Sequence, residues 1–580
     1  MNCREYDIFE HQINATMIRV LHALGLVLFA LPCPTVLFAQ NTVGLMSYDT
    51  EQVVEGYNLI FPQSGNQDTW LLDNCGRICK FWDGDTYGPG NQVFLGENGL
   101  LYKAIGNGAS SNAWFHAGGG GEGLEIRDVN DNITWQYFLS DSIYRFHHDF
   151  SVMPNGNILA IAWERHFETD CLANGADPER LLDGELWSEV VYEIEPVGSE
   201  EANIVWEWHA WDHLVQDFDE AQDNFGVVGD NPFKININFT PDSVGDWLHC
   251  NAIDYNANLD QIALSIPTFN EIWIIDHSTS TEQAATSSGG LAGRGGDLIY
   301  RWGNPRAYDQ GTTEDQILHY QHHIHWLDRE LPVGHPDYGK LGVFSNRLPD
   351  NSSEVLQWFA TFDDYEWEYP LTDGVWGPSA PEWTYTTDDP VYMYSTILSS
   401  MQRLQNGNTL IGVGRWGRSF EINPEGDIVW EYRLPLQSGS PVAQGTELGI
   451  NANFLWRASR YTPDYPGLEG WDLTPIGYIE LDPDTTACPL NTSVEEITVD
   501  LDWTVYPNPV QHTLQVVIGQ QRSRDLLLAV YNAQSALVLL EKFVPGEAIS
   551  VSLEQLPAGA YTVAVKSAEF GQHTRVIVKE

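Results

Sequence analysis

The chain repeats one β-type pattern, and this repeat constrains its fold more than any other feature of the sequence. In one half of the repeat a polar turn leads into an apolar strand, at residues 153–159 and again at 404–410. The Asn-Gly pairs in these turns supply the positive φ values that a tight hairpin requires. In the other half a strand ends in an aromatic pair, at 133–137, 204–208, 298–302 and 428–432. The pattern predicts an all-β protein built from many short sheets.

Repeated four-stranded sheets with a tryptophan at one strand end are typical of the blades of a β-propeller, whose radial closure also protects the sheet edges. A blade takes about 40 to 50 residues, so residues 45–485 have room for roughly six blades with long loops. No helical periodicity is sustained in this region. We therefore expect a six-bladed β-propeller, with an irregular array of β-sandwiches as the alternative.

A second folded unit is expected at the C-terminus. A short acidic linker covers residues 486–504, and short alternating strands follow over 505–580. This length and pattern predict a small β-sandwich.

The first forty residues have the pattern of a signal peptide. Arg19 precedes an apolar run over 20–38, and the small residue Ala39 stands before Gln40. Such a segment is removed from an exported protein. No later segment approaches the roughly twenty apolar residues that are needed to cross a bilayer, so we expect the mature protein not to span a membrane.

The charge balance excludes some partners. The chain has 81 acidic and 28 Lys and Arg side chains, a formal net charge of -53. Such a surface repels nucleic acid and anionic lipid. Because salt screens exposed charges over about 8 Å at physiological ionic strength, the excess also suggests a saline habitat.

Five cysteines lie beyond the expected signal peptide, an odd number for an oxidising compartment. Cys75 and Cys79 are close enough in sequence to pair locally, and at least one thiol stays unpaired. Cys250 stands beside His249, and we interpret it as a small buried hydrophobe rather than a reactive thiol.

Three histidine clusters each open a β-rich repeat. They are His147-His148-Asp149, His249-Cys250-Asn251 and the run from Gln321 to Trp326, which contains His322, His323 and His325. A propeller could deliver histidines from such repeats to one shared axis. In a strand, residues 323 and 325 share a face that 322 does not, so these three side chains are poorly placed to chelate one ion. We expect no metal and no cofactor.

These clusters resemble the aryl-sulfate sulfotransferase family, whose members work without the adenylyl-sulfate cofactor. The resemblance covers most of residues 45–485. It includes the segments 146–150, 247–253, 321–326 and 406–410, in that order.

The resemblance implies that one histidine attacks the sulfur of an aryl sulfate and forms a sulfohistidine, which a phenol then discharges. By motif position the nucleophile is His322. His148 corresponds to a general acid or base, and His249 and Asn251 to groups that hold the sulfuryl oxygens. Ser400 corresponds to a hydroxyl-bearing family position. We interpret His147, His319, His323 and His325 as structural.

Two positions depart from the family pattern. The strand after the His-x-Asn motif reads Ser265-Ile266-Pro267-Thr268, where family members carry a sulfate-binding arginine. Arg347 follows Asn346, where a glycine is expected, and either replaces the lost charge as a substrate-binding residue or faces solvent.

Residues 505–580 resemble the C-terminal sorting domain of the type IX secretion system. The shared features are the Tyr506-Pro507-Asn508-Pro509 opening, a Leu-x-x-Gly-x-Tyr strand that ends at Tyr561, and a short final strand that ends at Lys579. The resemblance implies export through the outer membrane by that machinery, followed by attachment to the cell surface or release.

Three other functions remain open. Water could discharge the same intermediate, which would make the protein an aryl sulfate hydrolase. The missing arginine instead favours a non-catalytic surface propeller that binds glycans or protein, because propellers host many functions. A quinone-dependent dehydrogenase is a fourth reading.

The acidic surface generates a first prediction. Turnover of an anionic aryl sulfate should rise with added salt up to a moderate concentration, because screening weakens its repulsion from the protein. Steady-state rates over a series of NaCl concentrations measure this. A rate that only falls with salt would contradict the saline interpretation.

Overall fold

The structure is a computed structural model. It describes residues 41–63, 68–84, 87–106, 112–239, 245–329, 331–488, 501–519, 526–532, 537–546, 548–567 and 571–580. The expected signal peptide, residues 1–40, lies outside the described residues. No helix in the described part of the chain is long and apolar enough to cross a membrane.

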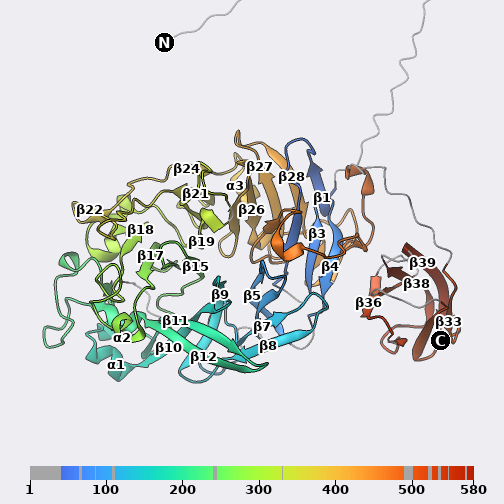
Figure 1. The fold of residues 1–580 in the computed structure, drawn as a ribbon, viewed down its shortest axis with the longest axis horizontal. Helices are drawn as coiled ribbons and strands as arrows, with labels where there is room; N and C mark the ends of the chain where they lie inside the picture. The colour runs from blue at the N-terminus through green and yellow to red at the C-terminus, as the bar shows by residue number, and fades with distance from the viewer. Residues whose placement is uncertain are drawn as a thin grey trace, which may run out of the picture. The chain divides into compact units, whose positions relative to one another are not determined.

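Residues 44–478 form six antiparallel sheets of four or five strands (Figure 1). Four of them follow the order of the chain, so that neighbouring strands are joined by hairpins or longer loops. Their strands are β5 (Gly88–Leu95), β6 (Leu101–Gly106), β7 (Gly123–Arg127) and β8 (Ile133–Phe138); β9 (Tyr144–Val152), β10 (Ile158–Phe167), β11 (Glu185–Val197) and β12 (Glu201–His209); β15 (Ala252–Asn256), β16 (Gln261–Ile266), β17 (Glu271–Asp276) and β18 (Tyr300–Trp302); and β19 (His322–Trp326), β20 (Leu341–Ser345), β21 (Glu354–Trp358) and β24 (Trp383–Tyr385).

The other two sheets join the beginning of the described chain to its later part. In one, β1 (Gly44–Tyr48) pairs with β28 beside β27, β26 and β25. In the other, β2 pairs with β31 on one side and β3 on the other, and β4 pairs with β32. The remaining bounds are β25 (Ser400–Arg403), β26 (Thr409–Val413), β27 (Arg418–Ile422), β28 (Ile428–Arg433), β2 (Tyr57–Ile60), β3 (Thr69–Asp73), β4 (Arg77–Trp82), β31 (Ser459–Tyr461) and β32 (Gly477–Tyr478).

Short elements decorate these sheets. The α-helices of the described chain are each at most six residues long. They are α1 (Glu168–Ala173), α2 (Thr281–Ala284) and α3 (Pro390–Met393). Three two-stranded ladders join β13 (Leu214–Val215) to β14 (Ile235–Asn236), β22 (Leu371–Thr372) to β23 (Val375–Trp376), and β29 (Leu436–Gln437) to β30 (Ser440–Pro441). The all-β class is confirmed.

The tryptophans of the repeat join neighbouring sheets. Each is buried and donates its indole N–H to a group in or next to the following sheet. Four of them lie in the last strand of their sheet in chain order, and the fifth, Trp82, lies outside the repeat in β4. A buried indole N–H needs such a partner, and the ring buries a large apolar area at the same time. The pairs are Trp135 to the Glu201 carbonyl, Trp206 to the Thr279 hydroxyl, Trp302 to the Pro378 carbonyl, Trp430 to the Asn74 carbonyl and Trp82 to the Asp128 carbonyl.

The junction between the β19–β24 sheet and the β25–β28 sheet uses an arginine instead. The guanidinium of Arg403, at the end of β25, donates to Gln357 Oε1 at 2.6 Å and lies 4.4 Å from the ring centroid of Trp383. With the two pairings of the N-terminal strands, these contacts connect every sheet to the next. The six sheets therefore form a closed, propeller-like series.

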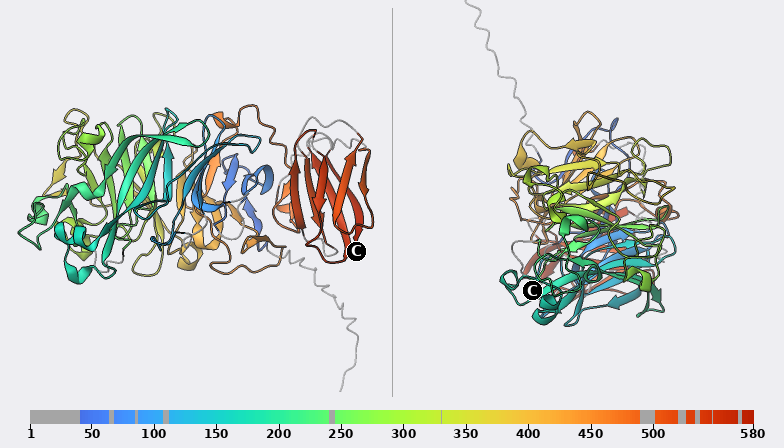
Figure 2. Two further views of the ribbon diagram at one scale, coloured as in Figure 1. Left: turned by 90° about the horizontal axis from the view of Figure 1, so that it is seen from below. Right: turned by 90° about the vertical axis from the view of Figure 1, so that its left-hand side faces the viewer.

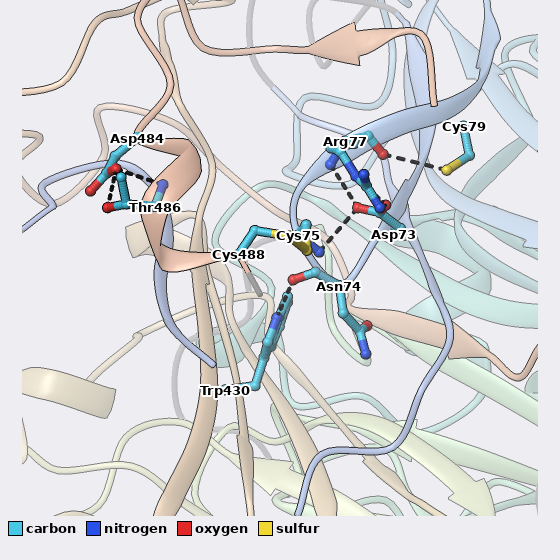
Figure 3. The surroundings of a disulfide bond; sticks show 9 residues. All are labelled: Asp73, Asn74, Cys75, Arg77, Cys79, Trp430, Asp484, Thr486 and Cys488. Carbon is cyan, nitrogen blue, oxygen red and sulfur yellow. Dashed lines mark hydrogen bonds and ion pairs between the residues drawn. A yellow bond between two sulfur atoms is a disulfide. The ribbon is translucent and has the colours of Figure 1, made fainter. Parts of the chain in front are cut away.

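A disulfide also ties the two ends of this series together. Cys75, in the turn between β3 and β4, is bonded to Cys488, 413 positions later (Figure 3). The expected local pair of Cys75 with Cys79 is wrong, because Cys79 is a buried free thiol on β4. Tertiary closure, which brings residue 488 back to the first strands, decides the pairing. Cys250 is fully buried and burial raises the pKa of its thiol, so it is a poor nucleophile.

Two further sheets, drawn in red in Figure 2, form the C-terminal sandwich. One has the order β33-β34-β37 and the other β36-β35-β38-β39. Alternate side chains from both sheets make one buried core that includes Leu514, Leu528 and Val563. The strands are β33 (Trp503–Tyr506), β34 (Thr513–Ile518), β37 (Ile549–Ser552), β35 (Leu526–Tyr531), β36 (Leu537–Phe543), β38 (Gly559–Ser567) and β39 (Gly571–Lys579).

The disulfide generates a prediction about stability. Replacing Cys75 and Cys488 together by serine should lower the free energy of unfolding by about 2–4 kcal/mol, because the unfolded chain regains the freedom of a very long loop. Thermal unfolding followed by circular dichroism measures the change. Added reductant should lower the Tm of the wild-type protein and leave that of the double variant unchanged. A double variant as stable as the wild type would show that the other closures suffice.

Candidate active site

The structure brings the three predicted catalytic histidines together. His148 lies in β9, His249 stands three residues before β15, and His322 begins β19, so each comes from the first strand of a different sheet or from the segment just before it. The ring centroids of His148 and His249 are 4.6 Å apart. Trp456 connects His148 and His322, at 5.9 and 6.2 Å from their ring centroids. Tyr320 lies 6.0 Å from both His249 and His322. Five rings therefore enclose one small region.

The backbone is in the left-handed conformation at three of the five residues whose rings enclose this region. His148, His249 and Tyr320 have φ values of 49°, 53° and 55°. A side chain disfavours this left-handed conformation, and such residues gather at functional sites, where surrounding contacts compensate for the strain. At His148 the compensation includes a hydrogen bond from its backbone N–H to the Gly119 carbonyl, at 2.7 Å. Position 119 requires glycine, because an added Cβ would lie 2.0 Å from His148 Nε2.

His322 is held in one tautomer. The Asn346 side chain donates its NH₂ group to two backbone carbonyls, of Ser395 at 2.8 Å and Leu398 at 2.9 Å. Its Oδ1 must then accept, and it lies 2.8 Å from His322 Nδ1. The proton of a neutral His322 is therefore on Nδ1, and Nε2 carries the lone pair. Burial lowers the pKa of His322 to about 3, so the ring is neutral at physiological pH.

His249 has the opposite electrostatic setting. Its Nδ1 forms a short hydrogen bond with the carboxylate of Asp246. Burial acts to lower the pKa of His249, but the charge and hydrogen bond of Asp246 outweigh it and raise the pKa above the ordinary value. His249 is thus the histidine of the cluster that holds a positive charge most readily.

His148 is anchored through His147. The two Nδ1 atoms are 2.8 Å apart, and His147 Nε2 lies 2.8 Å from Oε2 of Glu189. Burial and the neighbouring His249 lower the pKa of His148 well below its ordinary value. All three catalytic candidates are thus held through Nδ1.

Asn251 and Ser400 lie in the walls around the cluster, and both are fully buried. The Asn251 NH₂ group donates to the Gln321 carbonyl at 2.8 Å, so it fixes the backbone next to His322. The Ser400 hydroxyl accepts from the Ala458 backbone N–H at 2.9 Å. These contacts give both residues a positioning role. The expected contacts of Asn251 and Ser400 with substrate stay predictions.

Arg347 lies at the exposed edge of the cluster. Its guanidinium stacks on Tyr320, 3.4 Å from the ring centroid, and its Nε donates to the Thr396 carbonyl. The charge is therefore directed toward the cluster rather than left free in solvent. In the segment 265–268, where the resemblance implies an arginine, the Ser265 hydroxyl donates to the Gln321 carbonyl at 3.3 Å.

The other histidines of the 322–326 run face a different space. His323 and His325 stack with ring centroids 4.3 Å apart. They line a cavity of about 880 Å³ together with Arg329 and Arg457, whereas His148, His249 and His322 do not line it. No group of three or more His, Cys, Asp or Glu side chains within the described ranges is placed to hold a metal ion.

Sequence reasoning missed the side chains that orient the histidines. These are Glu189, Asp246, Asn346 and Trp456, together with His147, which was interpreted as structural. His147 and Asp246 had a local signal, because each precedes a catalytic candidate by one to three positions. Glu189 and Trp456 had none, since they reach the cluster only through tertiary structure.

Two parts of the chain match known protein families. Residues 59–283 match the model of the arylsulfotransferase (ASST) family. Residues 504–580 match that of the secretion system C-terminal sorting domain. The chain carries an arylsulfotransferase-family region and a secretion sorting domain. The family match includes His148, His249 and Asn251, and it ends before His322. No curated protein matches the chain.

Solved structures resemble the chain only distantly. A protein of unknown function from Bacteroides caccae is 10% identical, with 70% of this chain and 98% of that one covered and a TM-score of 0.37. A periplasmic gluconolactonase from Pseudomonas aeruginosa is 11% identical, with 66% and 96% covered and a TM-score of 0.31. A streptogramin B lyase is 10% identical, with 73% and 96% covered and a TM-score of 0.32. Likeness at this level says nothing about activity.

Proposed function

We propose that this protein is a secreted arylsulfotransferase that moves a sulfuryl group from an aryl sulfate to a phenol through a sulfohistidine at His322. One observation carries the proposal. Three imidazoles from distant parts of the chain converge, and each is held through Nδ1 by a different partner. The catalytic part is residues 45–485, the linker 486–504, and the sorting domain 505–580. That sorting domain indicates export to the cell surface or beyond.

His322 is suited to be the nucleophile. Asn346 keeps the proton on Nδ1, so the lone pair on Nε2 attacks the sulfur. The new N–S bond forms as the S–O bond to the aryl group breaks, and the departing oxygen takes up negative charge. The Asn346 carbonyl oxygen then faces the Nδ1–H of a cationic sulfohistidine. Covalent catalysis of this kind splits one difficult transfer into two easier ones.

The sulfuryl oxygens need fixed positive charge, because sulfuryl transfer, like phosphoryl transfer, spreads charge over the peripheral oxygens. His249, held protonated by Asp246, takes the place of the missing family arginine. Trp456 adds a buried indole N–H that has no partner among the described residues. Arg347, at the exposed edge, meets the anionic donor first.

His148 is the general acid for the leaving phenolate and the general base for the acceptor phenol. It gives a proton to the phenolate that leaves the donor, and it takes one from the phenol that attacks the sulfohistidine. The contact between the His148 and His249 rings supports this role, because it places the proton carrier beside the positive charge.

A covalent adduct tests the proposal. After exposure to 4-nitrophenyl sulfate without an acceptor, the tryptic peptide that contains His322 should gain the mass of one SO3 group by mass spectrometry. His322→Ala should lose the adduct and at least about a thousandfold of turnover, because no other residue can attack. His166→Ala, which removes a ring stacked on Trp211 outside the cluster, should keep both.

The absence of any adduct in active protein would contradict the mechanism. Product analysis then separates the other functions: transfer requires a phenol acceptor, hydrolysis proceeds without one, and a binding module keeps its ligand after His322→Ala and turns nothing over.

The charge of His249 generates a pH prediction. Below its raised pKa His249 is a cation, and the cation is lost as pH rises through that pKa, so kcat/KM should fall on the alkaline side. Asp246→Asn removes the group that raises the pKa and leaves burial, which lowers it. The alkaline limb should therefore move to lower pH by about one to three units.

The pH profile of kcat/KM for wild type and Asp246→Asn measures this shift. Asp170→Asn, a change at an exposed aspartate of α1, is the matched control and should leave the profile in place. An unmoved limb in Asp246→Asn would assign the charge to another group.

A further inference from the structure

Two fully buried groups lie behind His148 and have no part in the chemistry described so far. His147 stacks on Trp163, with ring centroids 4.2 Å apart and an interplanar angle of 6°. Its Nδ1 faces Nδ1 of His148 and its Nε2 faces Oε2 of Glu189, both at 2.8 Å. The other oxygen of Glu189, Oε1, accepts the backbone N–H of Cys250 at 2.7 Å. The side chains of His147 and Glu189 have no exposed surface.

This arrangement couples the protons of three groups. Each 2.8 Å contact holds one proton, which belongs to one side or the other. If Glu189 carries a proton on Oε2, it donates to His147, which donates from Nδ1 to His148, and the proton of His148 is on Nε2. If Glu189 is ionised, both rings hold the opposite tautomer and His148 Nε2 carries a lone pair. Whether Nε2 of His148 carries a proton thus depends on the protonation of Glu189.

Before substrate reacts, burial favours the arrangement in which Glu189 is protonated. It raises the pKa of Glu189 well above the ordinary value, with Asp246 acting in the same direction and Cys250 and His249 opposing. It lowers the pKa of His147, which faces Asp246, His249 and Arg145. His148 faces His249, His147, His322 and Arg457, all of which disfavour its cation. These directions favour the state in which all three groups are neutral and Glu189 holds the proton.

We propose that Glu189 and His147 form a proton relay that supplies His148 with the proton needed by the leaving phenolate. The proposal rests on the proposed sulfotransferase function. As the S–O bond breaks, His148 Nε2 gives its proton to the aryl oxygen. His148 Nδ1 takes the proton of His147 Nδ1, and His147 Nε2 takes the proton of Glu189. The products are a phenol, sulfohistidine at His322 and the Glu189 carboxylate.

The second half of the reaction restores the relay. An acceptor phenol gives its proton to His148 Nε2 while its oxygen attacks the sulfur, and the same two shifts return a proton to Glu189. No proton is exchanged with solvent over the cycle. The relay matters most for donors whose phenolate is a strong base and therefore a poor leaving group. It thus predicts that the substrates are aryl sulfates of ordinary phenols, with leaving-group pKa values near 10, like that of tyrosine.

Glu189→Gln isolates the relay from the structure around it. The glutamine NH₂ group can donate to His147 Nε2 and its carbonyl can accept from Cys250, so every resting hydrogen bond is kept. The amide cannot give up a proton. Sulfation of His322 by phenyl sulfate in a single turnover should slow by about a hundredfold or more. Sulfation by 4-nitrophenyl sulfate, whose phenolate leaves without a proton, should slow by less than about threefold.

Glu193→Gln is the matched control, because Glu193 lies on the same strand, β11, and binds Asn157 and His277 instead. It should leave both rates unchanged. His147→Gln breaks the relay at its middle and provides a second variant, with thermal unfolding to confirm that each protein is folded. A folded variant that slows with both donors equally, or with neither, would overturn the relay. Wild-type protein that sulfates His322 with neither donor would overturn the proposed function itself.

Discussion

The fold depends on one contact that recurs around the molecule, the indole that joins each sheet to the next. Sheets that twist and pack face to face expose backbone carbonyls at their outer corners. A tryptophan from the neighbouring sheet both covers apolar surface there and donates to such a carbonyl, for example from Trp135 to Glu201 and from Trp430 to Asn74. Repeated from sheet to sheet, these contacts join neighbours along most of the closed series.

A buried ion pair between Asp149 and Arg457 connects three distant segments of the chain. Asp149 accepts from Arg457 at 2.5 and 3.1 Å and from the Ile253 backbone N–H at 3.0 Å, which joins β9, β15 and the segment before β31. The residues that precede the two partners in the sequence, His148 and Trp456, belong to the candidate site. Arg457 itself lines the cavity that contains His323 and His325. The contact is bidentate and Asp149 also accepts two backbone N–H groups, which offsets part of the cost of removing both charges from water.

In the proposed mechanism a titratable charge stands where the family resemblance implies a permanent one. An arginine stays protonated at any physiological pH, whereas His249 depends on Asp246 for its charge. The same desolvation keeps His148 and His322 neutral, so one small region holds imidazoles of different charge. Partners at Nδ1 make this possible: a carboxylate for His249, an amide for His322 and a second imidazole for His148. Environments that push apart the pKa values of like groups are what acid–base chemistry needs.

Hydrophobic alternation, Asn-Gly turns and short motifs are local properties, so the all-β class, the sandwich at the C-terminus and the three histidine motifs could be predicted without the fold. The sequence also indicated that His322 faces away from His323 and His325, since strands alternate. Closure of the fold, in contrast, sets the pairing of Cys75 with Cys488, the return of β1 and β2 to late strands, and the partners Glu189 and Asn346. Glu189 lies about sixty positions from Cys250, and no local pattern marks it. Such contacts form when closure of the series brings the ends of distant strands together. Because water is excluded there, neighbouring side chains set the pKa and the protonation state of one another.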